Sequence, residues 1–268
     1  MYEIYAFEYA KYLHRRASEN FIGGDLHDGP MPLAYYVWLI RGGGRTILVD
    51  TGFNEAAGNA RNRPTAIAPD VALARFGVQP DEVTDVVVTH LHYDHAGNLD
   101  KFPRARFHIQ DREMCFATGR CMCHHALRHP FDVEPVVQMV RFVYSDRVVF
   151  HDGGSQLAPG IDLHLVGGHS DGLQVVTVET QRGPVVLASD AAHLFANMDR
   201  GLLFPIVYDA GDMVEGWKTV TRLAGSPDRV IPGHDPIVSE IYPREPGLGF
   251  TCLALHREPA PRHSGVPE

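Results

Sequence analysis

Residues 86–95 read VVVTHLHYDH, and this stretch decides the fold. The three valines predict a buried strand, because β-branched residues pack well in sheets. Four potential metal ligands, His90, His92, Asp94 and His95, follow within six residues. In an extended loop, side chains two residues apart point the same way, so His90 and His92 can share one ion while the next two ligands face another. We expect this site at the carboxyl end of a strand, where open α/β folds carry their ligands.

Two imidazoles do not complete a metal site, because zinc takes about four ligands and a catalytic ion keeps one position open for water. Three later positions qualify: His169 in GHSDG, Asp190 in SDA and His234 in PGH. Each follows an apolar run and sits among small residues that allow a close approach of the backbone. Taken singly, Asp190 also suits a helix N-cap, and the two histidines suit ordinary turns. Their joint occurrence in order favours a metal site.

The motifs HxHxDH, GHSDG, SDA and GH, in this order and at these separations, resemble the metallo-β-lactamase superfamily from Asp50 to His234. The resemblance implies an α/β fold, a four-layer αββα sandwich with the site at one edge. It also implies a ligand set: His90, His92 and His169 hold the first metal, Asp94, His95 and His234 hold the second, and Asp190 bridges both.

Length and composition bound the organisation of the chain. Its 268 residues, 44% of them hydrophobic, predict a single domain over residues 1–268. Residues 111–145 are helix-like with mixed periodicity and suit an insertion or a lid, and a proline-rich tail from about residue 258 is expected to be frayed. Helices are expected at 70–76 and around 212–224, and strands at 2–7, 35–40, 46–49, 86–88, 162–166, 174–178, 185–188 and 229–231.

Charge and cysteine content narrow the partners. A net charge of −9 without a cluster of lysines and arginines argues against nucleic acid, so a small or uncharged substrate is the default. No apolar run approaches the roughly 20 residues that span a bilayer, and no signal peptide is recognisable, so we expect a cytoplasmic protein with no membrane partner. The 4 cysteines are expected to be free thiols. Residues 121–125 (CMCHH) are an alternative metal site but lack CxxC spacing, and a half-buried helix surface is the other interpretation.

The ligand set predicts hydrolysis. Two adjacent metal ions lower the pKa of a shared water, so that a bridging hydroxide attacks a carbonyl that one ion polarises. Asp94 can take the proton of that hydroxide and pass it to the leaving alkoxide. Histidine and carboxylate ligands suit Zn²⁺ first, with iron, manganese and cobalt as alternatives. Asp50, in an Asp-Thr-Gly turn, either orients a ligand imidazole or caps the turn.

Within the superfamily, the chain looks most like the N-acyl homoserine lactonases of quorum quenching and their small-lactone relatives. This resemblance implies a lactonase acting on an N-acyl homoserine lactone-like ester. Those enzymes carry tyrosine three positions after the bridging aspartate, where this chain has His193. We expect His193 to donate a hydrogen bond during catalysis, with simple packing as the alternative.

Several alternatives stay open at this stage. The substrate is another lactone, an ester or a thioester, or the chain is a non-catalytic metal-binding sensor of the same fold. The oligomeric state is not readable from the sequence. Five apolar positions after Asp190 line either a substrate pocket or the packed core: Phe195, Met198, Phe204, Ile206 and Tyr208.

Overall fold

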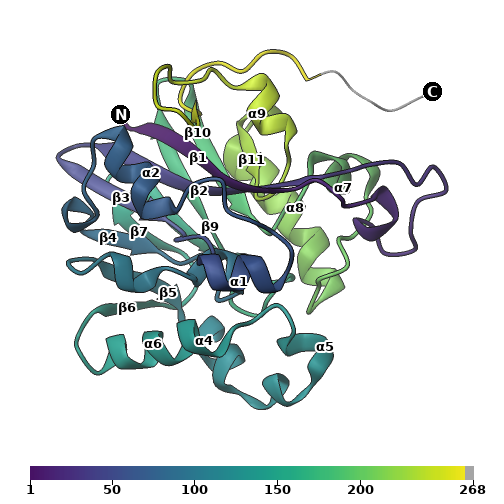
Figure 1. Ribbon diagram of the computed structural model, residues 1–268, viewed down its shortest axis with the longest axis horizontal. Coiled ribbons are helices and arrows are strands. Elements are labelled where there is room, and N and C mark those ends of the chain that lie inside the picture. Colours follow the sequence, from purple (N-terminus) through teal and green to yellow (C-terminus); the bar gives the residue numbers. More distant parts are fainter. Residues whose placement is uncertain (263–268) are drawn as a thin grey trace.

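Two β-sheets lie face to face in the computed structural model, which describes residues 1–262 (Figure 1). The first sheet has the order β12 (Thr251–Ala254), β1 (Glu3–Tyr12), β2 (Leu33–Gly42), β3 (Arg45–Val49), β4 (Asp85–Val87), β5 (Arg106–Gln110) and β6 (Val148–His151). The second has the order β11 (Val230–Pro232), β10 (Gly183–Ser189), β9 (Gln174–Thr180), β8 (Ile161–Leu165) and β7 (Ser155–Ala158).

Helices cover the outer faces of both sheets, and two further helices pack against the core between the sheets. Those that precede β7 in the chain are α1 (Glu55–Ala60), α2 (Pro69–Phe76), α3 (Tyr93–Ala96), α4 (Asp111–Thr118), α5 (His125–Arg128) and α6 (Val133–Val143). Those that follow it are α7 (Phe195–Arg200), α8 (Ala210–Ala224) and α9 (Ile237–Ile241). No helix within residues 1–262 is both long and apolar enough to cross a bilayer.

Strand β1 shows why the sheets are buried on both faces. Successive side chains of a strand point to opposite faces. Tyr5 and Phe7 pack in the core that includes Leu73 of α2, whereas Ile4 and Ala6 pack in the core between the two sheets. A third core joins the outer face of the second sheet to α8. The layers are therefore helix, sheet, sheet and helix, which confirms the predicted αββα sandwich.

The ends of the central strands determine where the site lies. Strands β3 and β4 run parallel in the first sheet, and β10 and β11 run parallel in the second. The loops that leave β4, β8, β10 and β11 carry, in that order, the HxHxDH motif, His169, Asp190 and His234. Parallel strands bring their carboxyl ends to one edge, so these loops meet there.

The expected elements all form, with bounds that differ by a few residues. Residues 111–143, where periodicity was mixed, contain α4, α5 and α6. The expected frayed tail is attached as far as the structure describes it: Ala260 N donates to Ile241 O at 2.8 Å, and Arg262 pairs with Asp199 at 3.0 Å. Residues 263–268 of that tail lie outside the described residues. A single domain over the whole chain stays a prediction.

Candidate metal centre

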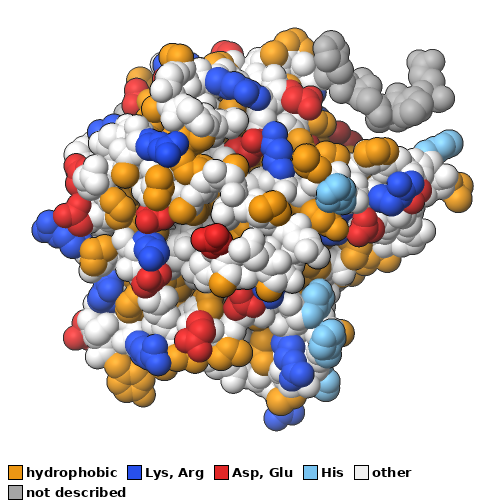
Figure 2. Space-filling model, viewed as in Figure 1, with side chains coloured by type: hydrophobic (Ala, Val, Ile, Leu, Met, Phe, Trp, Pro, Cys, Tyr) orange, Lys and Arg blue, Asp and Glu red, His pale blue; other side chains and the backbone are white. Residues whose placement is uncertain are grey.

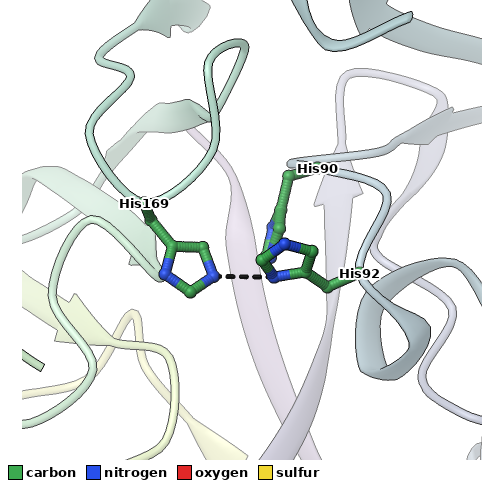
Figure 3. A group of neighbouring side chains, drawn as sticks. All are labelled: His90, His92 and His169. Atoms are coloured by element: carbon green, nitrogen blue, oxygen red, sulfur yellow. Dashed lines mark hydrogen bonds between the residues drawn. The ribbon is translucent and has the colours of Figure 1, made fainter. Parts of the chain in front are cut away.

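The first predicted ligand group is assembled as expected. His90, His92 and His169 offer nitrogen atoms that all lie within 4.8 Å of one another. His92 Nδ1 and His169 Nε2 face each other at 2.8 Å (Figure 3). Burial lowers the pKa of all three imidazoles, that of His169 to about 3. They are therefore neutral at physiological pH, which is the form that binds a metal.

The second predicted group, Asp94, His95 and His234, lies beside the first, with ligand atoms again within 4.8 Å of one another. His95 Nε2 is 3.8 Å from Asp94 Oδ1, and His234 Nε2 is 3.8 Å from Asp94 Oδ2. Asp94 and His95 are adjacent residues of the single turn α3, which holds both beside His234.

Asp190 stands between the two groups. Its Oδ1 atom lies 3.3 Å from His95 Nε2 and 3.0 Å from His234 Nε2. Its Oδ2 atom lies 3.1 Å from His169 Nε2 and 3.9 Å from His90 Nε2. One carboxylate oxygen thus faces each group, which is the arrangement a bridging ligand needs.

The chemistry of these atoms fits two divalent cations. His90 Nε2, His95 Nε2 and Asp190 Oδ1 are buried and have no hydrogen-bond partner within residues 1–262. Leaving buried polar atoms unpaired is costly, so such atoms point to a bound group. Imidazole nitrogens and carboxylate oxygens are the ligands that zinc and related metals accept. The seven residues hence form a set that can hold two ions.

The ligand imidazoles are oriented through their other nitrogen. His95 Nδ1 donates to Asp50 Oδ2 at 2.7 Å, His169 Nδ1 donates to Ile206 O at 2.8 Å, and His234 Nδ1 donates to Ala34 O at 3.0 Å. Such partners fix the tautomer and the direction of a metal-binding histidine. Asp50 therefore contacts the imidazole of His95, as the interpretation that it orients a ligand imidazole requires.

Gly233, next to His234, has no space for a side chain. A Cβ atom there would lie 2.6 Å from Asp190 Oδ1 and 2.8 Å from the Ser189 carbonyl carbon. Any larger residue would displace the carboxylate between the two groups. At Gly233, the absence of a side chain lets the backbone approach the site closely, as expected for the small residues around these motifs.

Glu113 is a site residue that the sequence did not indicate. This buried carboxylate of α4 accepts from Leu91 N at 2.8 Å, and from Ser170 Oγ at 2.7 Å and Gly172 N at 3.1 Å. It thereby joins the HxHxDH loop to the GHSDG loop. No motif or spacing signals this role, because Glu113 lies on a helix remote in sequence from both partners' loops.

His193 lies within the same cluster. Its Nε2 atom is 2.9 Å from Asp190 Oδ2, and its Nδ1 atom is buried without a hydrogen-bond partner within residues 1–262. His193 also groups with His169 and Asp190 at ligand distances. The structure thus places the imidazole at the site and leaves two roles for it, a hydrogen-bond donor to the substrate or a further metal ligand.

The two ligand groups and Asp190 together form what we call the ligand cluster. A narrow cavity of about 30 Å³ opens onto this ligand cluster. Phe204 and Ile206 line it, whereas Phe195 and Met198 pack in the core between the sheets and Tyr208 lines a neighbouring cavity. The five apolar positions after Asp190 therefore divide between pocket and core. Arg15 and Arg63, which belong to no motif, also line the narrow cavity.

A larger cavity of about 580 Å³ lies among α4, α5 and α6. Phe131 lines it, and the Phe131 ring stands edge to face on His92 at 4.5 Å, so this ring separates the larger cavity from the ligand cluster. Residues 121–125 border this region, but within the described chain their thiols and imidazoles do not come together as a group of three potential ligands.

Surface charge on the visible face is mixed. Figure 2 shows acidic and basic side chains interspersed over that face, without a continuous basic patch. Phosphate-backbone binding needs such a patch. The expectation that the chain binds no nucleic acid stays a prediction.

A protein family and several curated proteins resemble this chain in sequence. A family model described as the metallo-beta-lactamase superfamily matches residues 30–234. Among curated proteins, an N-acyl homoserine lactonase of a Bacillus species is 25% identical over 206 residues, which cover 71% of this chain and 75% of the relative. The N-acyl homoserine lactonase AiiB of Agrobacterium fabrum is 31% identical over 132 residues, 47% of this chain and 46% of the relative.

Solved structures share the fold. A quorum-quenching N-acyl homoserine lactone lactonase aligns with a TM-score of 0.71 at 24% identity. The alignment covers 88% of this chain and 92% of the lactonase chain. The dizinc quorum-quenching lactonase AidC, solved with a product, aligns with a TM-score of 0.71 at 18% identity, covering 88% of each chain. At these identities the likeness establishes the fold alone.

Proposed function

The chain belongs to the metallo-beta-lactamase superfamily, and from this premise we propose that it is a dinuclear-metal-dependent hydrolase that opens the ester bond of a small lactone. The observation that carries the proposal is the position of Asp190, with one carboxylate oxygen toward each of two ligand groups. A structural carboxylate needs no such symmetry, whereas a dinuclear site does.

The proposed ligands are those of the two groups: His90, His92 and His169 for one ion, and Asp94, His95 and His234 for the other, with Asp190 shared. When bound, two divalent ions supply a nucleophile from water at neutral pH and polarise the carbonyl oxygen of an ester. We propose Zn²⁺, because the set combines imidazoles and carboxylates, with iron, manganese and cobalt as alternatives that metal availability selects.

Asp94 is proposed to move a proton during ester cleavage. Its backbone is held by Tyr9, whose hydroxyl donates to Asp94 O at 2.9 Å. Its carboxylate lines the narrow cavity and stays 11% exposed, so a substrate can reach it. A carboxylate at this position can take a proton from the attacking water and deliver it to the departing alkoxide.

A lactone is proposed because the relatives named above are N-acyl homoserine lactonases. N-acyl homoserine lactones are therefore the reference substrates, and the activity on other lactones, esters and thioesters is compared with the activity on them. A non-catalytic sensor has no need of an open dinuclear site, so the complete set of seven potential ligands favours the enzyme.

Metal-dependent turnover tests this function. The purified chain is assayed against N-acyl homoserine lactones of several chain lengths, other γ- and δ-lactones, and aryl esters, and its metal content is measured by elemental analysis. We expect about two ions per chain and lactone cleavage that chelation abolishes and metal restores. Active protein without metal, or metal-loaded protein that cleaves none of these compounds, would refute the proposal.

A further inference from the structure

Two arginines face the cavity in which the ligand cluster lies. Arg15 follows β1, and Arg63 lies between α1 and α2, so they come from different segments of the chain. Both line the same narrow cavity as His92, Asp94 and the other ligands. In a chain with a net charge of −9, two cations beside one small cavity call for an explanation.

Arg15 is held in place by neutral groups. Its Nε atom donates to Asn20 Oδ1 at 2.5 Å, and one terminal nitrogen donates to Glu19 O at 2.6 Å. Its guanidinium lies 4.9 Å from the centre of the Phe204 ring, a ring that also lines the cavity. These contacts fix the direction of the charge without neutralising it.

Arg63 is enclosed by tyrosines. It donates to the Tyr93 hydroxyl, and its guanidinium lies 5.2, 5.9 and 5.5 Å from the ring centres of Tyr12, Tyr35 and Tyr93. Its Nε atom is buried and has no hydrogen-bond partner within residues 1–262. A buried donor of a charged group is costly to leave unpaired, so this atom points to a ligand that the protein binds.

Neighbouring arginines show that pairing is available in this region. Arg16 pairs with Asp28 at 2.7 Å, and Arg61 pairs with Asp132 at 2.6 Å. By contrast, no carboxylate within residues 1–262 comes within 4.0 Å of Arg15 or Arg63 as an ion pair. Among these four arginines, the two at the cavity are thus the ones without a carboxylate partner at that distance within residues 1–262.

We propose, on the basis of the hydrolase function above, that Arg15 and Arg63 bind a carboxylate carried by the substrate, so that the substrate class is anionic lactones. A guanidinium presents its N–H groups in a fork that matches a carboxylate. Bound cations would increase the positive charge further. Of the expected small or uncharged substrate, this proposal keeps the small size and adds a negative charge.

Two probes that differ in one group test the proposal. They are 5-oxotetrahydrofuran-2-carboxylate and its carboxamide, which share the lactone ring and differ in the group on the carbon next to the ring oxygen. The rate of each probe with hydroxide alone is used to correct for the resulting difference between the leaving alkoxides. For the metal-loaded wild type we expect kcat/KM to be about 10- to 100-fold higher for the carboxylate, the range given by a charge-assisted hydrogen bond. Arg63→Met and Arg15→Met should each lower kcat/KM for the carboxylate far more than for the carboxamide, and so remove much of this preference.

Controls separate binding from folding. Arg104→Met removes an exposed arginine outside the cavity and should keep the full preference. Arg63→Lys and Arg15→Lys keep the charge without the fork and should fall between wild type and the methionine variants. Metal content and circular dichroism are recorded for every variant.

The outcomes distinguish the two proposals. Equal cleavage of both probes by the wild type would overturn the anionic class and leave the lactonase function standing. Equal losses on both probes in the arginine variants would show a structural role and overturn it as well. Failure of the wild type on every lactone and ester would refute the function itself, and the substrate class with it.

Discussion

The imidazole of His193 lies flat on the phenyl ring of Phe204, with ring centres 3.7 Å apart and planes 8° apart. This contact fixes the ring plane, and the edge that carries Nε2 consequently faces Asp190 at 2.9 Å. His193 is therefore presented to the ligand cluster in one orientation.

The first prediction separates the two roles of His193. If its N–H donates to the developing oxyanion, His193→Phe should lower kcat at least about tenfold with unchanged metal content. His193→Tyr should keep much of the activity, because a phenol also donates. Elemental analysis of both variants is the control, since loss of an ion in His193→Phe would identify a ligand. Unchanged kinetics would make the histidine a packing residue only.

The second prediction concerns the assignment of ligands to two ions. His169→Ala should lose mainly the ion of the first group, and His234→Ala mainly that of the second, so each variant should retain about one ion per chain. Elemental analysis after exhaustive dialysis measures this. His108→Ala, at a buried histidine that bonds Asp85 at 2.9 Å away from the cluster, is the matched control and should retain both ions. Loss of both ions in each ligand variant would contradict independent sites.

The ligand set was predictable because its members lie close in sequence or follow strands in recognisable small-residue motifs. The spacing of residues 90–95 indicates which of their side chains can bind the same ion. Apolar runs predict strands just before His169, Asp190 and His234, so these residues are expected at strand ends. The same reasoning gives the αββα layers. The contact between Asp50 and His95 was one of two interpretations that the sequence left open, because metal-binding imidazoles need an acceptor and an Asp-Thr-Gly turn also suits a cap.

Residues that act through tertiary contacts were not predictable. Glu113 reaches two loops from α4, and Arg15 and Arg63 meet the cavity from segments 48 positions apart, which no local spacing encodes. Net charge does not reveal the charge that lines the cavity, because it averages over the whole chain, whereas Arg15 and Arg63 line one cavity. Residues 111–143 were ambiguous because their helices are short and only partly buried.

The third prediction tests proton transfer by Asp94. Asp94→Asn should lower kcat by roughly 100-fold or more while KM changes little, if the carboxylate protonates the leaving alkoxide. The loss should be smaller for nitrophenyl esters, whose leaving groups need little protonation. Steady-state kinetics on an alkyl lactone and on a nitrophenyl ester give the comparison. Equal losses on both would leave Asp94 with ligation alone.

The fourth prediction follows from the hydrogen bond between Asp50 and His95. Asp50→Asn should weaken binding of the ion held by the second group by about 10- to 100-fold, because the imidazole loses its charged acceptor. Competition with a chromogenic chelator measures the affinity. Asp85→Asn is the matched control, since Asp85 is also buried and also accepts from a histidine, but away from the cluster. Equal weakening in both variants would point to general destabilisation.

The fifth prediction uses the titration of Glu113. Burial raises the pKa of the Glu113 carboxyl to about 7, although hydrogen bonds from Ser170, Leu91 and Gly172 lower it in part. The folded protein therefore holds this proton more tightly than the unfolded chain does. The stability that the group contributes is fully present below its ordinary pKa of about 4.5 and is lost as the pH rises through about 7.

Glu113→Gln removes this titration while keeping the shape of the side chain. Relative to the variant, the wild type should lose stability between about pH 4.5 and 7, by no more than about 3 kcal/mol, and then remain level at higher pH. Urea unfolding at a series of pH values measures the difference. Because glutamine has one acceptor oxygen where three donors converge, the variant should also bind metal more weakly at pH 8, where the wild-type carboxylate is ionised. A stability difference that is independent of pH would show that Glu113 is ionised throughout, and that its three hydrogen bonds outweigh its burial.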